Sequence, residues 1–207
     1  MADLLQSDAT PWLMPLLAVL ALLLIWLIYR FFRGRSSSLR RAFNEIAFER
    51  IEGIVIPSAD EGEIQIDQLL LTSQGLLIVD IKDVYGTVFG SDKMQDWAVI
   101  SDERRYTFSN PQPMLHDRIA AVRQIVRQVP VTGRILFLDG AEFTKGVPGL
   151  VCTLEELVDE FREPDKKAAK FKIEAFMPHW ELIQKAASSA EIVSSPLSRK
   201  SGRRSRS

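Results

Sequence analysis

The sequence predicts an α/β domain, in which a mixed sheet is flanked by helices, behind one N-terminal transmembrane helix. Three observations predict this. An uncharged apolar run opens the chain, strand-like segments separated by turn residues follow, and the apolar residues then change to helical spacing. With 207 residues, of which 46% are hydrophobic, the chain has room for one domain of ordinary size beside that helix.

The apolar run near the N-terminus has the length of a membrane span. No charged residue occurs from Ala9 to Tyr29, and about 20 such residues cross the hydrocarbon core of a bilayer. A cleavable signal peptide would have a basic start and a shorter apolar core, whereas this start is acidic. We therefore expect a short non-cytoplasmic N-terminus over residues 1–10 and a transmembrane helix, in contact with the lipid bilayer, over residues 11–32.

Charge is segregated along the chain, and this predicts the topology. Five arginines lie within Arg30–Arg41, whereas residues 1–29 carry only two charges, both acidic. Because basic residues flank the cytoplasmic side of a span, we expect a single-pass protein of a bacterial inner (plasma) membrane with its C-terminal body in the cytoplasm. The basic linker over 33–41 is expected to contact anionic lipid. Cys152 is the only cysteine, which suits a reducing compartment, and it reads as a small buried hydrophobe at a strand end.

The body of the protein is expected over residues 42–187. A short amphipathic helix is expected over 39–50, across the start of the body, and strand signals follow it. The predicted strands are 53–57, 63–72, 75–82, 85–90, 95–100 and 104–108. The segments between them are short and rich in Gly, Ser and Asp, which is typical of hairpin turns. This half of the sheet is therefore expected to be antiparallel.

Helical spacing starts after the segment "SNPQP". Apolar residues recur three and four positions apart between Leu115 and Val129. The arginines on the other faces of this predicted helix are Arg118, Arg123 and Arg127. They could meet phosphate groups, but an acidic residue interrupts them and an ordinary solvated face explains them equally well.

The C-terminal part alternates strand and helix signals. The expected elements are strands at 133–140 and 150–153, a helix ending at Phe161, a helical region over 166–187 broken near Pro178, and a disordered basic tail over 188–207. Thr153 and Glu156 have the spacing of a capping box for the first of these helices.

Two predicted strands carry charges among their apolar residues. In "GLLIVDIKDVYG" (75–86), Asp80 and Lys82 are two positions apart and so point to the same face of the sheet. Asp67 interrupts the apolar strand "IQIDQLLLT", and the "SQG" turn predicts that the two strands form a hairpin. That hairpin can bring Asp67 near Asp80. A buried charge is costly unless it is paired or bound.

Two carboxylates and an ammonium group in this arrangement permit metal-assisted hydrolysis. Asp67 and Asp80 can provide oxygen ligands for Mg²⁺ (or Mn²⁺) while leaving positions for water. The ion lowers the pKa of bound water and stabilises charge on a phosphoryl oxygen, and Lys82 can orient the water or offset the phosphate charge. The same residues fit a structural interpretation, in which Asp80 and Lys82 form a surface ion pair and Asp67 accepts hydrogen bonds from the backbone.

The stretch "QIDQLLLTSQGLLIVDIKDVYGTVFG", followed by Trp97 and "NPQP", resembles the nuclease-related domain (NERD) family. That family is similar to the restriction-endonuclease-like PD-(D/E)xK superfamily. The resemblance covers about residues 45–130 and implies a metal-dependent nuclease core of a mixed sheet flanked by helices. It implies that Asp67 is the first metal-binding acid, Asp80 the second, and Lys82 the catalytic lysine.

Several positions of the family pattern differ in this chain. Asp80 stands where the family has Glu, Asp83 where it has Asn, Gln68 where it has His, and Met114 where it has the Gln of its N-P-x-x-Q motif. Gln112 could replace that glutamine only if the helix starts differently. The auxiliary candidates for the site are Glu45, Glu49 and Gln112, the two glutamates being the nearby acids on the expected first helix.

The sequence therefore predicts a membrane-anchored, metal-dependent nuclease that hydrolyses phosphodiester bonds of DNA or RNA. The alternative is a catalytically inactive, membrane-anchored interaction module with the same fold. Residues 42–191 hold 25 acidic and 16 basic side chains, a net charge of −9, which counts against broad affinity for nucleic acid. The basic tail, or a locally basic cleft, would have to hold the substrate.

Overall fold

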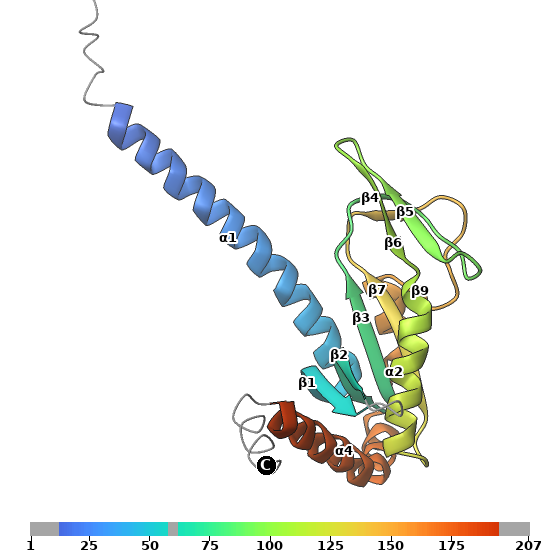
Figure 1. The fold of residues 1–207 in the computed structure, drawn as a ribbon. Coiled ribbons are helices and arrows are strands. Elements are labelled where there is room, and N and C mark those ends of the chain that lie inside the picture. The colour runs from blue at the N-terminus through green and yellow to red at the C-terminus, as the bar shows by residue number, and fades with distance from the viewer. Residues whose placement is uncertain (1–12, 58–61, 195–207) are drawn as a thin grey trace, which may run out of the picture. The chain divides into compact units, whose positions relative to one another are not determined.

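The computed structural model describes residues 13–57 and 62–194 (Figure 1). The chain divides into two compact units, Met1–Arg41 and Ala42–Ser207. In chain order, the elements are α1 (Leu13–Ile46), β1 (Ala47–Pro57), β2 (Glu63–Thr72), β3 (Gly75–Lys82), β4 (Gly86–Phe89), β5 (Asp96–Ile100), β6 (Arg105–Ser109), α2 (Pro111–Ile125), β7 (Val131–Phe137), β8 (Ala141–Phe143), β9 (Val151–Cys152), α3 (Leu154–Phe161) and α4 (Lys166–Ser194).

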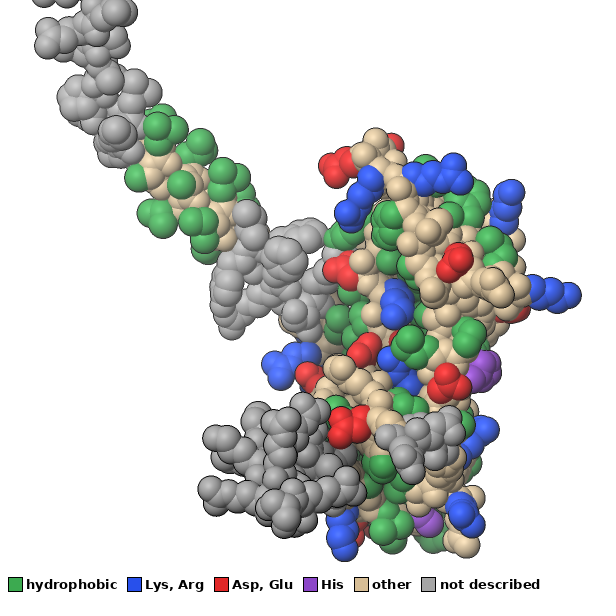
Figure 2. Space-filling view, in the orientation of Figure 1, with side chains coloured by type: hydrophobic (Ala, Val, Ile, Leu, Met, Phe, Trp, Pro, Cys, Tyr) green, Lys and Arg blue, Asp and Glu red, His purple; other side chains and the backbone are tan. Residues whose placement is uncertain are grey.

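Helix α1 contains the apolar run of the first unit. The side chains of residues 16–27 are all apolar and all exposed, and Figure 2 shows this stretch as hydrophobic surface. The expected N-terminus over 1–10, and residues 11 and 12 of the expected span, lie outside the described residues. Within the part of the chain that the structure describes, no helix is long and apolar enough to cross a membrane. The transmembrane helix over 11–32 therefore stays a prediction.

The segment after the apolar run differs from the expected linker and short helix. Residues 33–41 are helical and continue α1 without a break. The helix expected over 39–50 is correct as far as Ile46 and wrong after it, because β1 begins at Ala47. β1 pairs with β2 along almost its whole length, so the ladder of backbone hydrogen bonds overrides the local helical preference. Glu49 therefore lies on a strand.

The first sheet is mixed, as predicted, with the strand order β1-β2-β3-β7-β9. β1, β2 and β3 pair antiparallel, whereas β3, β7 and β9 pair parallel. α2 lies over Gly133 of β7, where an added Cβ would come within 2.8 Å of Leu115, and α3 contacts the next residue, Arg134. Because successive residues of a strand point to opposite faces, α2 and α3 cover opposite faces of this sheet. α4 packs beside α2, against β1 and β2.

The second sheet has the order β6-β5-β4-β8. Its antiparallel part was predicted, but β8 was not, because three residues are too short to show a strand pattern. Trp97 of β5 is fully buried and its ring contacts those of Phe108, Phe137 and Phe143. Since Phe137 belongs to β7, this aromatic cluster joins the two sheets.

The C-terminal helices agree with the sequence in part. Thr153 and Glu156 form the predicted capping box of α3. α4 runs through Pro178 without the expected break, because the residues after it stay packed in the core and offset the lost hydrogen bond. Residues 188–194, expected to belong to the disordered tail, are helical. The remainder of the expected tail, 195–207, lies outside the described residues.

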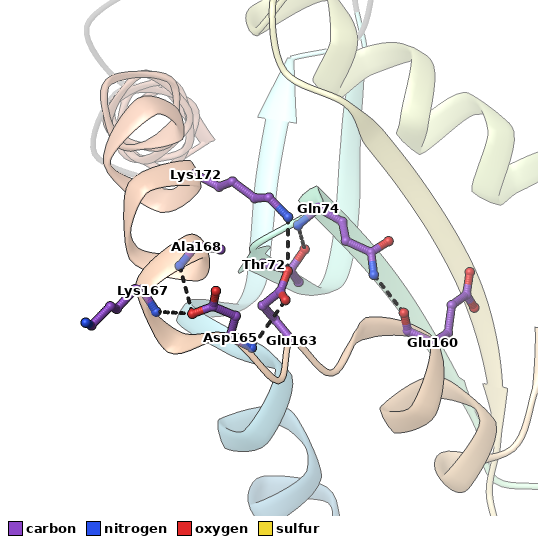
Figure 3. Close-up of polar contacts among 8 residues, drawn as sticks. All are labelled: Thr72, Gln74, Glu160, Glu163, Asp165, Lys167, Ala168 and Lys172. Carbon is purple, nitrogen blue, oxygen red and sulfur yellow. Dashed lines mark hydrogen bonds and ion pairs between the residues drawn. The ribbon is translucent and has the colours of Figure 1, made fainter.

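The closed end of the β2–β3 hairpin is held by hydrogen bonds (Figure 3). The hydroxyl of Thr72 donates to the carbonyl of Gly75 at 2.9 Å and accepts from the backbone N–H of Gln74 at 3.1 Å. The side-chain amide of Gln74 donates to the carbonyl of Glu160 at 2.7 Å. The turn is therefore fixed within itself and tied to α3, so the two strands that leave it have one register.

The same view shows how the first turn of α4 is capped (Figure 3). One carboxylate oxygen of Asp165 accepts from the backbone N–H groups of Lys167, at 2.9 Å, and of Ala168, at 3.3 Å. Lys172 donates to the carboxylate of Glu163 at 3.0 Å. Residues 165–167 repeat the acid-x-lysine pattern of residues 80–82. Here the acid caps the exposed start of a helix.

The hairpin predicts a strong effect of Gly75→Ala. Gly75 has a φ of +125°, and a Cβ there would lie 2.3 Å from the carbonyl oxygen of Pro130. We expect the substitution to lower the free energy of unfolding by about 2 kcal/mol or more, as measured by denaturant unfolding. Gly149→Ala is the matched control, because its Cβ would meet nothing within 4 Å. Equal stability of the two variants would contradict the structure of the turn.

Cys152 gives a chemical test of the core. It is 5% exposed on β9, as its sequence context predicts, and burial raises the pKa of its thiol to about 12. The thiol should therefore stay protonated at pH 8 and react with a thiol-specific reagent only slowly in the folded protein, but with full stoichiometry in denaturant. A native reaction as fast as the denatured one would show that this thiol is not buried.

Candidate active site

β2 and β3 bring Asp67 and Asp80 to opposed positions. The last pair of the β2–β3 ladder is Gln68 with Val79, so Asp67 and Asp80 are the next residues beyond it. Opposed residues of antiparallel strands point to the same face. Continuing this register places Asp67 and Asp80 opposite each other at the open end of the hairpin, on the face that α2 covers.

The three groups expected at the site differ in exposure. Asp80 is fully buried, at 0% exposed, whereas Asp67 and Lys82 are half-buried. Burial raises the pKa of Asp80; the positive charges of Arg118 and Lys82 act in the opposite direction, and the charge of Asp67 adds to the increase. The interpretation of Asp80 as half of a surface ion pair with Lys82 is therefore wrong.

Arg118 is the charge partner that the structure provides for Asp80. Its Nη1 donates to Oδ2 of Asp80 at 2.5 Å, and its Nε donates to the carbonyl oxygen of Gln65 at 2.7 Å. Arg118 is 9% exposed, so of the two alternatives left open for it, the ordinary solvated helix face is wrong. Because Gln65 lies on β2 and Asp80 on β3, the guanidinium bridges the two strands just beyond their last ladder pair.

The spacing of α2 contained a signal for this role. Arg118 follows Leu115 by three positions and precedes Val122 by four, and residues at these spacings share a helix face. Both neighbours are fully buried. The absence of a side chain at Gly133 lets Leu115 and Ile119 approach the sheet closely, which carries Arg118 towards Asp80.

The structure does not bring the two auxiliary glutamates to the carboxylate pair. Glu45, near the end of α1, forms an ion pair with Arg162 at 2.7 Å. Glu49 lies on β1 opposite Leu71, which is four positions along β2 from Asp67. Each glutamate is thus placed towards the closed end of the hairpin.

Gln112 lies in the first turn of α2. α2 begins at Pro111, and its N-cap Asn110 accepts a hydrogen bond from the backbone N–H of Gln112 at 3.0 Å. The residues that line the cavity beside this helix start, of about 410 Å³, are Asp92, Gln112, Pro113, His116, Gly149 and Leu150. Met114, which stands at the glutamine position of the motif, is 57% exposed. The exposed Met114 therefore does not replace the family's glutamine beside Asp80.

The donor set fits a divalent cation through two carboxylates. Oδ1 of Asp80 is buried and has no hydrogen-bond partner among the described residues, so it is free to accept a cation, and Asp67 is opposed to it. Among the residues that the structure describes, no group of three or more His, Cys, Asp and Glu side chains could hold a metal. Mg²⁺ often uses only one or two carboxylates and completes its shell with water and substrate phosphates.

Together, the mixed sheet, its flanking helices and the two opposed acids of one hairpin define a mixed α/β domain with a candidate acidic site. Residues 36–138 match the family model described as nuclease-related domain (NERD). The chain therefore belongs to the NERD family through this segment, as the resemblance of its sequence implied. The matched segment runs from α1 to β7 and contains Asp67, Asp80, Lys82 and Arg118. No curated protein and no solved structure matched the chain.

The buried ion pair predicts non-additive stability. Removing one partner leaves an uncompensated buried charge, which costs about 3–5 kcal/mol, so Arg118→Met should destabilise the protein by that amount. Asp80→Asn in the same chain removes the orphaned charge, and we expect the double variant to be more stable than Arg118→Met alone. Denaturant unfolding of the wild-type protein, Arg118→Met, Asp80→Asn and the double variant measures this coupling. Purely additive losses would show that the two side chains do not interact.

Proposed function

We propose that this protein is a membrane-anchored, divalent-cation-dependent nuclease that hydrolyses phosphodiester bonds of DNA or RNA. The observation that carries the proposal is the opposed placement of Asp67 and Asp80 at the open end of the β2–β3 hairpin, with Lys82 two positions further on the same face. Membership of the nuclease-related family supports the same conclusion.

Asp67 and Asp80 would hold Mg²⁺ or Mn²⁺. The partnerless Oδ1 of Asp80 supports this assignment, because a buried carboxylate oxygen is costly unless a cation or donor satisfies it. When bound, the ion supplies a water of lowered pKa and stabilises charge on the phosphoryl oxygen.

Two basic side chains, Lys82 and Arg118, would act on the substrate and on the carboxylate of Asp80. The ammonium group of Lys82, half-buried on the site face, would contact a non-bridging phosphate oxygen and offset its growing negative charge. Lys82 and Arg118 also lower the pKa of Asp80 against the effect of burial, which favours the ionised carboxylate that a metal requires.

The charge of the body bears on how substrate would be held. On the face seen in Figure 2, acidic and basic side chains are interspersed over the body. Since affinity for nucleic acid depends on displacing counterions with basic groups, we assign substrate retention to the basic C-terminal segment 192–207, which has five basic residues and no acid.

Membrane anchoring belongs to the same proposal. Residues 16–27 of α1 are apolar and exposed, and the five arginines of Arg30–Arg41 follow them. A bilayer would cover the apolar residues, and anionic lipid would attract the arginines. The body would then face the cytoplasm of a bacterial cell, at its inner membrane.

A specific observation favours a second candidate, a catalytically inactive interaction module. Arg118 already neutralises Asp80 within the fold, so the buried carboxylate is stable without a metal. The replacement of the motif's glutamine by the exposed Met114 points the same way.

A nuclease assay of the full chain in detergent, with Mg²⁺ or Mn²⁺, separates the two candidates. Cleavage of DNA or RNA is expected, and Lys82→Ala should lower its rate about 100-fold or more. Lys167→Ala is the matched control, because Lys167 ends the other acid-x-lysine triplet and is exposed. Asp67→Asn should also abolish cleavage. If all four proteins show equal cleavage, or none, the nuclease proposal fails and the interaction module remains.

A further inference from the structure

The open end of the β2–β3 hairpin holds four charged groups that balance one another. Asp67 and Asp80 contribute two negative charges, and Lys82 and Arg118 contribute two positive ones. The other three groups act on Asp80, since the charges of Arg118, Lys82 and Asp67 each alter its pKa. The cluster is thus neutral as it stands, without any bound ion.

A divalent cation would disturb this balance. Beside Asp80 it would lie close to the guanidinium that already bonds Oδ2, and like charges repel strongly where the surroundings exclude water. Asp80 is 0% exposed and Arg118 only 9% exposed, so solvent screens the repulsion little. No third carboxylate joins the two acids within the described part of the chain.

Arg118 makes two separate hydrogen bonds, so the one to Asp80 can break while the other is kept. Its Nε is bonded to a backbone carbonyl, that of Gln65, and its Nη1 to Asp80. The guanidinium could therefore release the carboxylate while its Nε stays on β2. Oδ1 of Asp80, which has no partner among the described residues, would meet an incoming cation first.

We propose that Arg118 is a resident counter-cation of Asp80 that competes with the divalent ion for this carboxylate. The inference rests on the proposed function, because it takes Asp67 and Asp80 as the metal ligands. Arg118 is accordingly a positioning residue: it holds Asp80 in the metal-free protein and gives up Oδ2 to an incoming ion, and an anionic phosphate substrate would then restore the balance of charge.

Mn²⁺ titration of the purified full chain, by calorimetry and by thermal unfolding, tests the competition without substrate. Arg118→Gln should bind Mn²⁺ about 10- to 100-fold more tightly than the wild-type protein, because it removes a positive charge that repels the ion in buried surroundings, with a larger Mn²⁺-dependent rise in Tm. Arg118→Lys keeps the charge and loses one of the two contacts, so its affinity should lie between the two. Arg127→Gln, at an exposed position just after the same helix, should match the wild type.

The opposite results overturn the inference. If Arg118→Gln binds Mn²⁺ as weakly as the wild-type protein, or more weakly, Arg118 does not compete for Asp80. If Arg118→Gln is unfolded, Mn²⁺ should restore its circular dichroism, since the ion replaces the lost cation, and failure to do so counts against the proposal. Failure of the nuclease proposal is seen separately, as cleavage that Lys82→Ala leaves unchanged, whatever the order of the Mn²⁺ affinities.

Discussion

The ion pair between Arg118 and Asp80 is the contact on which the open end of the hairpin depends. β2 and β3 pair only as far as Gln68 and Val79, and beyond that point the guanidinium takes the place of ladder hydrogen bonds by bonding one group on each strand. A carboxylate that is 0% exposed would be destabilising alone. The same contact therefore links α2 to the sheet, keeps a charge buried, and determines what else can reach that charge.

The rest of the fold keeps the pair in register. At its closed end, the hairpin is tied to α3 through Gln74 and turns tightly at Gly75. On the site face, Gly133 leaves room for α2 to approach β7. Gly133 thus lets Arg118 reach Asp80, and the turn at Gly75 fixes the register that sets Asp67 opposite Asp80. The candidate site thus lies at the end of two hydrogen-bonded strands, whereas the face of the body seen in Figure 2 carries mixed charge.

The hairpin and its charges could be predicted from the sequence because they depend on local signals. Apolar runs on either side of the "SQG" turn specify two adjacent strands, and a two-residue spacing fixes Asp80 and Lys82 on one face. Arg118 lies 38 residues from Asp80, and no local pattern specifies which helix covers which face of a sheet. The same reason explains the error at Ala47, where pairing with β2 overrides a helical pattern, and at Pro178, where tertiary packing maintains a helix across a proline.

Two acids share their surroundings with two intrinsic cations, and under our proposal a metal enters by taking the place of one of these cations. A crystal structure of the full chain soaked in Mn²⁺, with the anomalous signal of manganese recorded, tests this most directly. The account predicts manganese between Asp67 and Asp80, with the guanidinium of Arg118 withdrawn from Oδ2. Manganese bound there while Arg118 still bonds Oδ2, or no manganese at these carboxylates, would contradict it.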